Sequence, residues 1–105
     1  MTAVAAPVYD ALGDRNRLRI VIRLCEEGPK STSALSESIT RQAAAKHLAL
    51  LEDAGLVRSE KRGRERIWSV QTESLTAAAD YLNMLSRKWD QRIEALRALV
   101  ERDQD

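Results

Sequence analysis

The apolar residues of this chain recur with the three-to-four-residue spacing of helices, in segments that glycine, proline and small polar residues separate. A short first helix is expected to begin at Pro7, because proline fits the first turn of a helix, and to stop at Gly13. Residues 1–6 show no such pattern and are expected to form a loose terminus. The apolar side of this helix would carry Val8, Tyr9 and Leu12.

Asp14 is a suitable N-cap for a second helix, which Gly28 and Pro29 would end. Cys25 falls on its apolar side, so we expect a small buried residue there rather than a redox sensor, which needs an exposed thiol of low pKa. The apolar residues of this helix are Leu18, Val21, Ile22, Leu24 and Cys25.

Two more helices are expected in close succession. Ser31 is a candidate N-cap for a short third helix containing Leu35 and Ile39. Thr40 would cap a fourth helix, residues 41–54, which the following glycine stops. The apolar side of this fourth helix carries Ala44, Leu48, Leu51 and Ala54.

Beyond Gly55 the pattern changes to short runs of β-branched and aromatic residues, which are typical of strands. Two such runs, residues 56–60 and 66–70, flank a turn centred on Gly63 and predict a β-hairpin. Trp68 is expected on the second strand under this hairpin, with its indole N–H available for a hydrogen bond.

A long last helix is expected from its N-cap, Thr72, to about Val100. Every seventh residue from Leu75 is apolar, and further apolar positions widen this row into a heptad-like stripe. The stripe could pack within one subunit, but so long a terminal helix has little else of its own chain to cover it, which favours pairing with a second copy. The stripe comprises Leu75, Ala79, Leu82, Leu85, Trp89, Ile93, Leu96, Leu99 and Val100.

Composition limits the functional classes. The 105 residues suit one domain, and the net charge of +1 is not that of a generally basic protein. However, segment 58–66 concentrates basic residues, which indicates a directed patch. One cysteine permits no intrachain disulfide, and neither a signal peptide nor a membrane-spanning run is visible, so we expect a cytoplasmic protein with no membrane partner. No catalytic arrangement or phosphate loop appears, so neither enzyme activity nor a cofactor is expected.

The stretch from Ser31 to Val70 orders a short helix, a tight turn, a second helix and a basic hairpin, as in a winged helix-turn-helix. The start of the second helix would enter the major groove, where arginine pairs with guanine and glutamine with adenine. The hairpin cations suit phosphates or the neighbouring minor groove. The candidate DNA contacts are Arg41, Gln42, Lys46 and His47 on the helix, and Lys61, Arg62, Arg64 and Arg66 on the hairpin.

Plainer interpretations compete with DNA binding. Winged domains also bind proteins, and a basic hairpin can be a solvated surface. His47 directly precedes Leu48, which is expected to be buried, so a packing or capping role competes with a DNA contact at this residue. The presence of both the helix pair and the basic hairpin favours DNA binding.

The segment TRQAAAKHLALLEDAGLV followed by RGRERIWSV resembles the recognition helix and wing of the ArsR/SmtB family of winged helix-turn-helix repressors. The earlier segment ALGDRNRLRIVIRLCEEGPKSTSALSESI is similar to the first three helices of that family, so the resemblance extends from about Val8 to Val100. It implies a homodimer joined by the first and last helices. It also implies that Thr40, Arg41, Gln42 and Lys46 lie near the DNA, with the wing alongside.

The chain departs from this family where many members bind metal. Ser31 and Ser33 stand where those members carry a cysteine-rich box, and the last helix contains no histidine. One cysteine and one distant histidine do not make a zinc-type site, so no metal is expected. The chain resembles instead a non-metal-sensing subgroup with a W-D-x-R turn, here residues 89–92.

The resulting prediction is a mainly α protein with a small β-hairpin. It is a single winged helix-turn-helix domain, residues 1–105, with five helices and a two-stranded wing, dimerising through its first and last helices. The helix-turn-helix would span about 31–54, the wing about 56–70 and the dimerisation helix about 72–100. The expected dimer interface comprises Val8, Tyr9, Leu12, Leu82, Leu85, Trp89, Ile93 and Leu96.

The expected function is that of a transcriptional regulator, a homodimeric repressor that binds a pseudo-palindromic operator in double-stranded DNA. A small-molecule effector is a further possible partner. Its pocket would lie at the dimer seam, near Tyr81, Met84 and Trp89.

Overall fold

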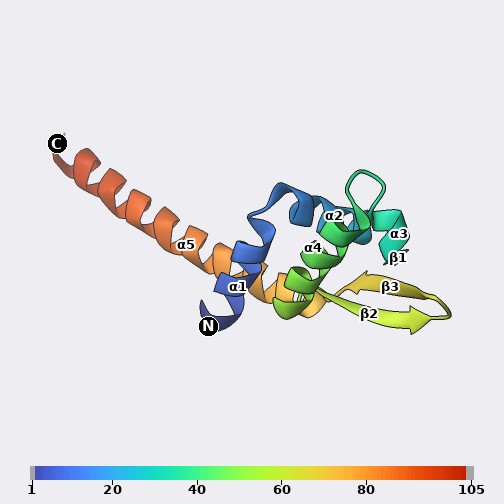
Figure 1. Cartoon of the computed structure of the whole chain (residues 1–105). Coiled ribbons are helices and arrows are strands. Elements are labelled where there is room, and N and C mark those ends of the chain that lie inside the picture. The colour runs from blue at the N-terminus through green and yellow to red at the C-terminus, as the bar shows by residue number, and fades with distance from the viewer. Residues whose placement is uncertain (1, 104–105) are drawn as a thin grey trace.

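The structure, a computed structural model, describes residues 2–103, which form five helices and a small antiparallel sheet (Figure 1). This arrangement confirms the predicted fold class. Met1, part of the predicted loose terminus, lies outside the described residues. In chain order the elements are α1 (Thr2–Leu12), α2 (Arg15–Glu27), β1 (Lys30–Ser31), α3 (Thr32–Leu35), α4 (Arg41–Asp53), β2 (Val57–Arg62), β3 (Glu65–Val70) and α5 (Thr72–Asp103).

Short polar side chains begin three helices where the sequence predicts them. A side-chain oxygen at each N-cap accepts a backbone N–H that the first helical turn would otherwise leave without a partner. Gly55 follows α4 with φ of 78°, a left-handed conformation that suits glycine, and it ends this helix as predicted. The N-cap bonds join Asp14 to Arg17, Ser31 to Ala34 and Thr40 to Ala43, at 3.0, 3.1 and 3.0 Å respectively.

The start of α1 differs from the prediction. The helix begins at Thr2, so Pro7 lies inside it and most of the predicted loose terminus is helical. Alanine is frequent in this segment and favours helix. Since Pro7 lacks an N–H, the helix lacks one backbone hydrogen bond at this residue.

The end of α3 also differs from the prediction, because the helix stops at Leu35 and excludes Ile39. Ser36 explains the early stop. Its hydroxyl lies 3.0 Å from the carbonyl oxygens of both Thr32 and Ser33, so its single proton is shared between two acceptors of the last turn, where the Ser36 N–H also donates to the Ser33 carbonyl. Ile39 therefore lies in the turn that leads to α4.

The buried side of α2 was predicted wrongly in part. Its buried residues are Ile20, Val21 and Leu24, whereas Cys25 is exposed, as are Leu18 and Ile22. At about 100° per residue, the row through Cys25 points about a third of a turn away from the buried row. Both rows have helical spacing, so the apolar pattern alone did not select between them.

The sheet has three strands in the order β1-β3-β2, all antiparallel, where the sequence predicts only the two-stranded wing. The additional strand pairs Lys30 with Trp68 and Ser31 with Ile67. Two residues are too few to show strand alternation, which is why this strand was not predicted. The wing turns at Gly63, whose φ of 62° is left-handed.

The core lies where α1, α2, α4 and the base of the wing meet. Leu48 and Leu51 of α4 are fully buried there together with Val8, Leu56 and Val57. Two polar bonds tie the periphery to this core. The indole N–H of buried Trp68 donates to Oγ1 of Thr32 at 2.8 Å, as the sequence allowed, and the hydroxyl of Tyr9 donates to the Ala78 carbonyl.

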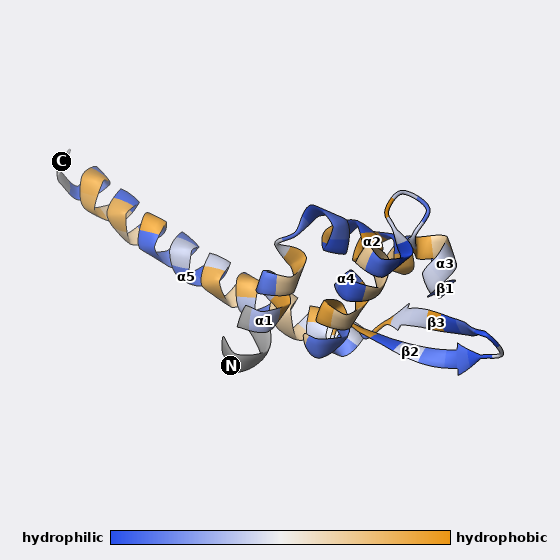
Figure 2. Ribbon diagram, viewed as in Figure 1, coloured by the Kyte–Doolittle hydropathy of each residue, from blue (hydrophilic) through white to orange (hydrophobic). Residues whose placement is uncertain are grey.

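The last helix, α5, extends far beyond the rest of the fold (Figure 1). Its first part packs against α1, while its later part carries an apolar stripe that stays exposed within one chain (Figure 2). Leu82, Trp89 and Leu96 are 53%, 61% and 62% exposed. Among residues 2–103, no helix is long and apolar enough to cross a membrane.

Candidate nucleic-acid interface

One side of α4 is buried in the core, and the opposite side presents exposed polar residues at the N-terminal end of the helix. Ala44 and Leu48 are buried on the core side. The outward residues Gln42 and Lys46 are four positions apart and therefore share one face. The four residues that the family resemblance assigns to DNA, Thr40, Arg41, Gln42 and Lys46, are all exposed at this end.

Because Thr40 caps α4, we expect Thr40→Ala to lower the free energy of unfolding by about 1 kcal/mol. The bond lost is that from the Ala43 N–H to Oγ1 of Thr40, at 3.0 Å. Urea unfolding followed by circular dichroism measures the change. Thr40→Ser keeps the hydroxyl and serves as the control, so equal stability of the alanine and serine variants would contradict the capping role.

The pairing of β2 with β3 sorts the wing charges onto two faces. Alternate residues of a strand point to opposite sides, so Lys61 and Arg66 share the face that carries buried Val57 and Trp68 at the base of the wing. That face therefore turns toward α4, and its polar members, including Ser59, are neutral or basic. The opposite face carries Arg58, Glu60, Arg62 and Glu65.

Arg62 is separated from the other three wing cations that were predicted to contact DNA. Nη2 of Arg62 lies 3.7 Å from Oε2 of Glu60 on the face away from α4. Both side chains are exposed, so the pair contributes little stability but reduces the net charge of that face. Lys61 and Arg66 face α4, and Arg64 in the turn lines the space between the wing and α4.

That space is a cleft formed by α4 on one side and the wing on the other. Within it, Nη1 of Arg66 donates to Oγ of Ser59 at 2.8 Å. Ser59 was not among the residues predicted to contact DNA, and the expected strand, residues 56–60, ended before Lys61; in the structure β2 extends to Arg62, which places Ser59 and Lys61 on one face. The cleft is lined by Thr32, Arg41, Ala45, Glu52, Ser59, Arg64, Arg66 and Trp68.

His47 points inward rather than toward the exposed end of α4. Its side chain is 17% exposed, and Nδ1 lies 3.8 Å from Oδ2 of Asp14, the N-cap of α2. The backbone N–H of Arg17 holds the pKa of Asp14 below its ordinary value, and the positive charge of Arg17 adds to this effect. This geometry favours the packing role for His47, while its predicted DNA contact stays a prediction.

The residues predicted for the dimer interface divide into three groups. Val8 is fully buried within one chain, so it has no surface left for a partner and its assignment was wrong. Tyr9 and Leu12 are half-buried and pack against the core. Leu82, Leu85, Trp89, Ile93 and Leu96 remain exposed along α5.

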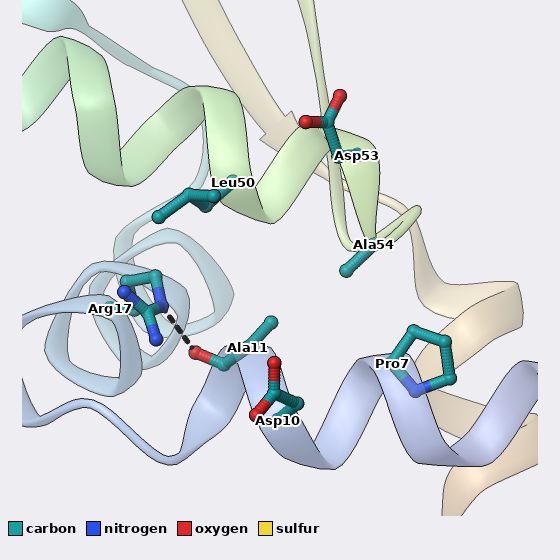
Figure 3. Close-up of a pocket in the computed structure, with 7 residues that line it drawn as sticks. All are labelled: Pro7, Asp10, Ala11, Arg17, Leu50, Asp53 and Ala54. Atoms are coloured by element: carbon teal, nitrogen blue, oxygen red, sulfur yellow. Dashed lines mark hydrogen bonds between the residues drawn. The ribbon is translucent and has the colours of Figure 1, made fainter.

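The structure has two hollows to compare with the predicted effector site, one on α5 and one elsewhere. A shallow one on α5, formed by Leu85, Lys88, Trp89 and Arg92, adjoins the predicted position near Trp89. A second lies between α1 and α4, where Asp10, Arg17 and Asp53 line it together with four apolar residues, Pro7, Ala11, Leu50 and Ala54 (Figure 3). Nε of Arg17 donates to the Ala11 carbonyl at 2.7 Å, so this side chain also closes the end of α1. The effector itself stays a prediction.

The two serines at the positions of the family's cysteine-rich box lie at the start of α3. Ser31 accepts the Ala34 N–H, and Ser33 lies in the first turn of α3. Across residues 2–103, no three histidine, cysteine, aspartate or glutamate side chains gather as they would around a metal ion.

Comparison with known proteins finds relatives over most of the chain. Residues 12–60 match the helix-turn-helix domain family. The chain is 41% identical over 76 residues to the uncharacterised HTH-type transcriptional regulator YuzN of Bacillus subtilis (strain 168), covering 65% of this chain and 83% of that protein.

Solved structures are similar over a longer stretch. An ArsR-like transcriptional regulator from Rhodococcus sp. RHA1 superposes with a TM-score of 0.81 at 35% identity, covering 92% of each chain. HlyU from Vibrio cholerae N16961 superposes with a TM-score of 0.67 at 26% identity, covering 80% of this chain and 92% of that one.

Proposed function

This chain belongs to the ArsR-like family of helix-turn-helix transcriptional regulators, and from that membership we propose that it is a homodimeric repressor that binds a pseudo-palindromic operator in the cytoplasm. Its relatives are regulators rather than enzymes, in agreement with the sequence prediction. One observation carries the proposal: the exposed polar end of α4 stands beside the wing face that has no carboxylate.

In this proposal the N-terminal end of α4 enters the major groove. Gln42 can form two hydrogen bonds to adenine, and Arg41 can form two to guanine. Lys46, one turn further along, reaches the base edges or the adjoining phosphates. The buried side of α4, with Leu48 at its centre, fixes the angle at which these side chains are presented.

The wing contributes affinity rather than sequence preference. Lys61, Arg64 and Arg66 offer positive charge on the α4 side, where they would contact phosphates or the adjacent minor groove. Phosphate contacts release counterions, so affinity falls steeply as salt rises.

We propose that α5 joins the two protomers through its exposed apolar stripe, with α1 alongside. A two-fold dimer would set the two α4 helices about 34–36 Å apart, one turn of DNA, so that each reads one half-site. Repression would follow from occupation of promoter DNA. A small-molecule effector at the seam, near Trp89, would act by changing the spacing of the two α4 helices.

The base-reading role of α4 is tested by alanine variants. We expect Arg41→Ala and Gln42→Ala to cost about 1–3 kcal/mol of operator binding each and to relax the base preference. Arg64→Ala should instead weaken operator and scrambled duplexes alike. Fluorescence anisotropy with both duplexes measures these changes, and Arg97→Ala, on distant α5, controls for loss of one positive charge. Unchanged affinity and preference in both α4 variants would show that α4 does not read the operator.

The competing function is a winged module that binds a protein through the hairpin. Retention on DNA that is strong at low salt and lost at high salt favours the DNA-binding proposal. Binding no better than to scrambled DNA at every salt concentration would favour the protein partner.

A further inference from the structure

The cleft between α4 and the wing has a closed end and an open end. α4 leads into β2 through residues 54–56, so the two elements lie close at the C-terminal end of α4 (Figure 1). Glu52 lines the cleft at this end. Arg41 lines it at the opposite end of α4, and Arg64 and Arg66 line it on the wing. Positive charge therefore gathers at the open end, and the carboxylate lies at the closed end.

Duplex geometry determines what would lie in this cleft. A major groove and the neighbouring minor groove are separated by one sugar-phosphate strand. If α4 occupies the major groove and the wing reaches the minor groove beside it, that strand must cross the space between them. In this chain that space is the cleft lined by the three arginines.

Arg66 is already held in this cleft. Its Nη1 donates to Oγ of Ser59, and Ser59 stands directly opposite Trp68, whose indole is fixed by Thr32. The position of the Ser59 hydroxyl is therefore fixed by the strand pairing. A guanidinium has five N–H donors, so the bond to Ser59 leaves others free for a phosphate. Prior ordering of the side chain also reduces the entropy lost when DNA binds.

We infer that the cleft seats one phosphodiester of the strand between the two grooves, and that Ser59 is a positioning residue that holds Arg66 for this contact. The inference rests on the proposed DNA-binding function and assigns the phosphate contact within it. Glu52 keeps the phosphate at the open end, because a carboxylate repels it from the closed end.

The test uses the full chain and a random-sequence duplex of about 30 base pairs at low salt, since a phosphate contact does not depend on sequence. A promoter duplex is measured alongside. We expect Ser59→Ala to weaken binding about three-fold and Arg66→Ala about ten-fold, on both duplexes equally. Ser59→Thr keeps the hydroxyl and should bind as the wild type does. Ser69→Ala, which removes a serine from the opposite face of the wing, is the matched control.

Two further readouts separate positioning from a general weakening of the fold. In an Arg66→Ala background, Ser59→Ala should have no additional effect, because the group it positions is gone. Arg66→Ala should also reduce the slope of log affinity against log salt by about one per lost phosphate contact.

Each outcome has a defined consequence. Wild-type affinity in Ser59→Ala, or an equal loss in both backgrounds, would overturn the positioning role while the DNA-binding function stands. If Arg66→Ala leaves the slope of log affinity against log salt unchanged, the inference that the cleft binds a phosphate is overturned. Failure of the wild-type protein to bind either duplex would overturn the inference and the proposed function together.

Discussion

Replacing Leu48 with alanine is expected to lower the free energy of unfolding by about 2–5 kcal/mol. Leu48 is fully buried on the side of α4 that faces the core, so the substitution removes apolar contacts and leaves a cavity that the surrounding elements can fill only partly. Domains of this size are stable by about 5–15 kcal/mol, so much of the stability would be lost.

Leu50 supplies the matched control, because it is the same residue type on the same helix but is 42% exposed. Leu50→Ala should cost less than about 1 kcal/mol, since little buried surface is removed. Urea unfolding of both variants, followed by circular dichroism, measures the difference. Equal losses at the two positions would mean that α4 is not anchored to the core through Leu48.

If α5 joins two protomers as proposed, replacing Trp89 with aspartate is expected to convert that proposed dimer to monomer and to reduce operator affinity by about 10²–10⁴-fold. Trp89 lies in the middle of the exposed stripe of α5, where a buried charge would oppose pairing. A monomer binds one half-site only and loses the effective concentration that links the second half-site to the first.

Gln91→Asp places the same charge on the opposite side of α5 and should leave both dimer and affinity unchanged. Sedimentation equilibrium gives the oligomeric state, and anisotropy gives the affinity. Trp89→Asp should leave the free energy of unfolding of a single chain nearly unchanged, because this side chain is exposed within one chain. A Trp89→Asp variant that remains dimeric would remove α5 from the interface.

The start or end of a helix could be predicted from the sequence where a single residue determines it. The three N-caps, Asp14, Ser31 and Thr40, follow from residue type alone, because each side chain accepts a backbone N–H of the first helical turn. The helix stop at Gly55 follows likewise, because glycine readily adopts the left-handed conformation that ends a helix. Features that depend on packing were less predictable. On α2 two apolar rows have helical spacing, and only contact with the other elements selects the row of Ile20 over that of Cys25.

Parts of the candidate site depend on long-range register, which the sequence does not contain. The charge cluster of 58–66 was visible, but its division into two faces required the pairing of β2 with β3. Val8 has the spacing of an interface residue yet is buried within its own chain. His47 lies on the predicted recognition helix, but its side chain is only 17% exposed and its Nδ1 lies 3.8 Å from Oδ2 of Asp14, 33 residues earlier in the sequence.

Binding of the purified protein to the DNA upstream of its own coding sequence tests the central claim most directly. Fluorescence anisotropy would be recorded at low and moderate salt, with a scrambled duplex as the control. We expect saturable binding by a dimer, preference for the upstream duplex at both salt concentrations, and affinity that falls steeply as salt rises. Equal affinity for the upstream and scrambled duplexes at both salt concentrations would contradict the claim that α4 and the wing together recognise an operator there.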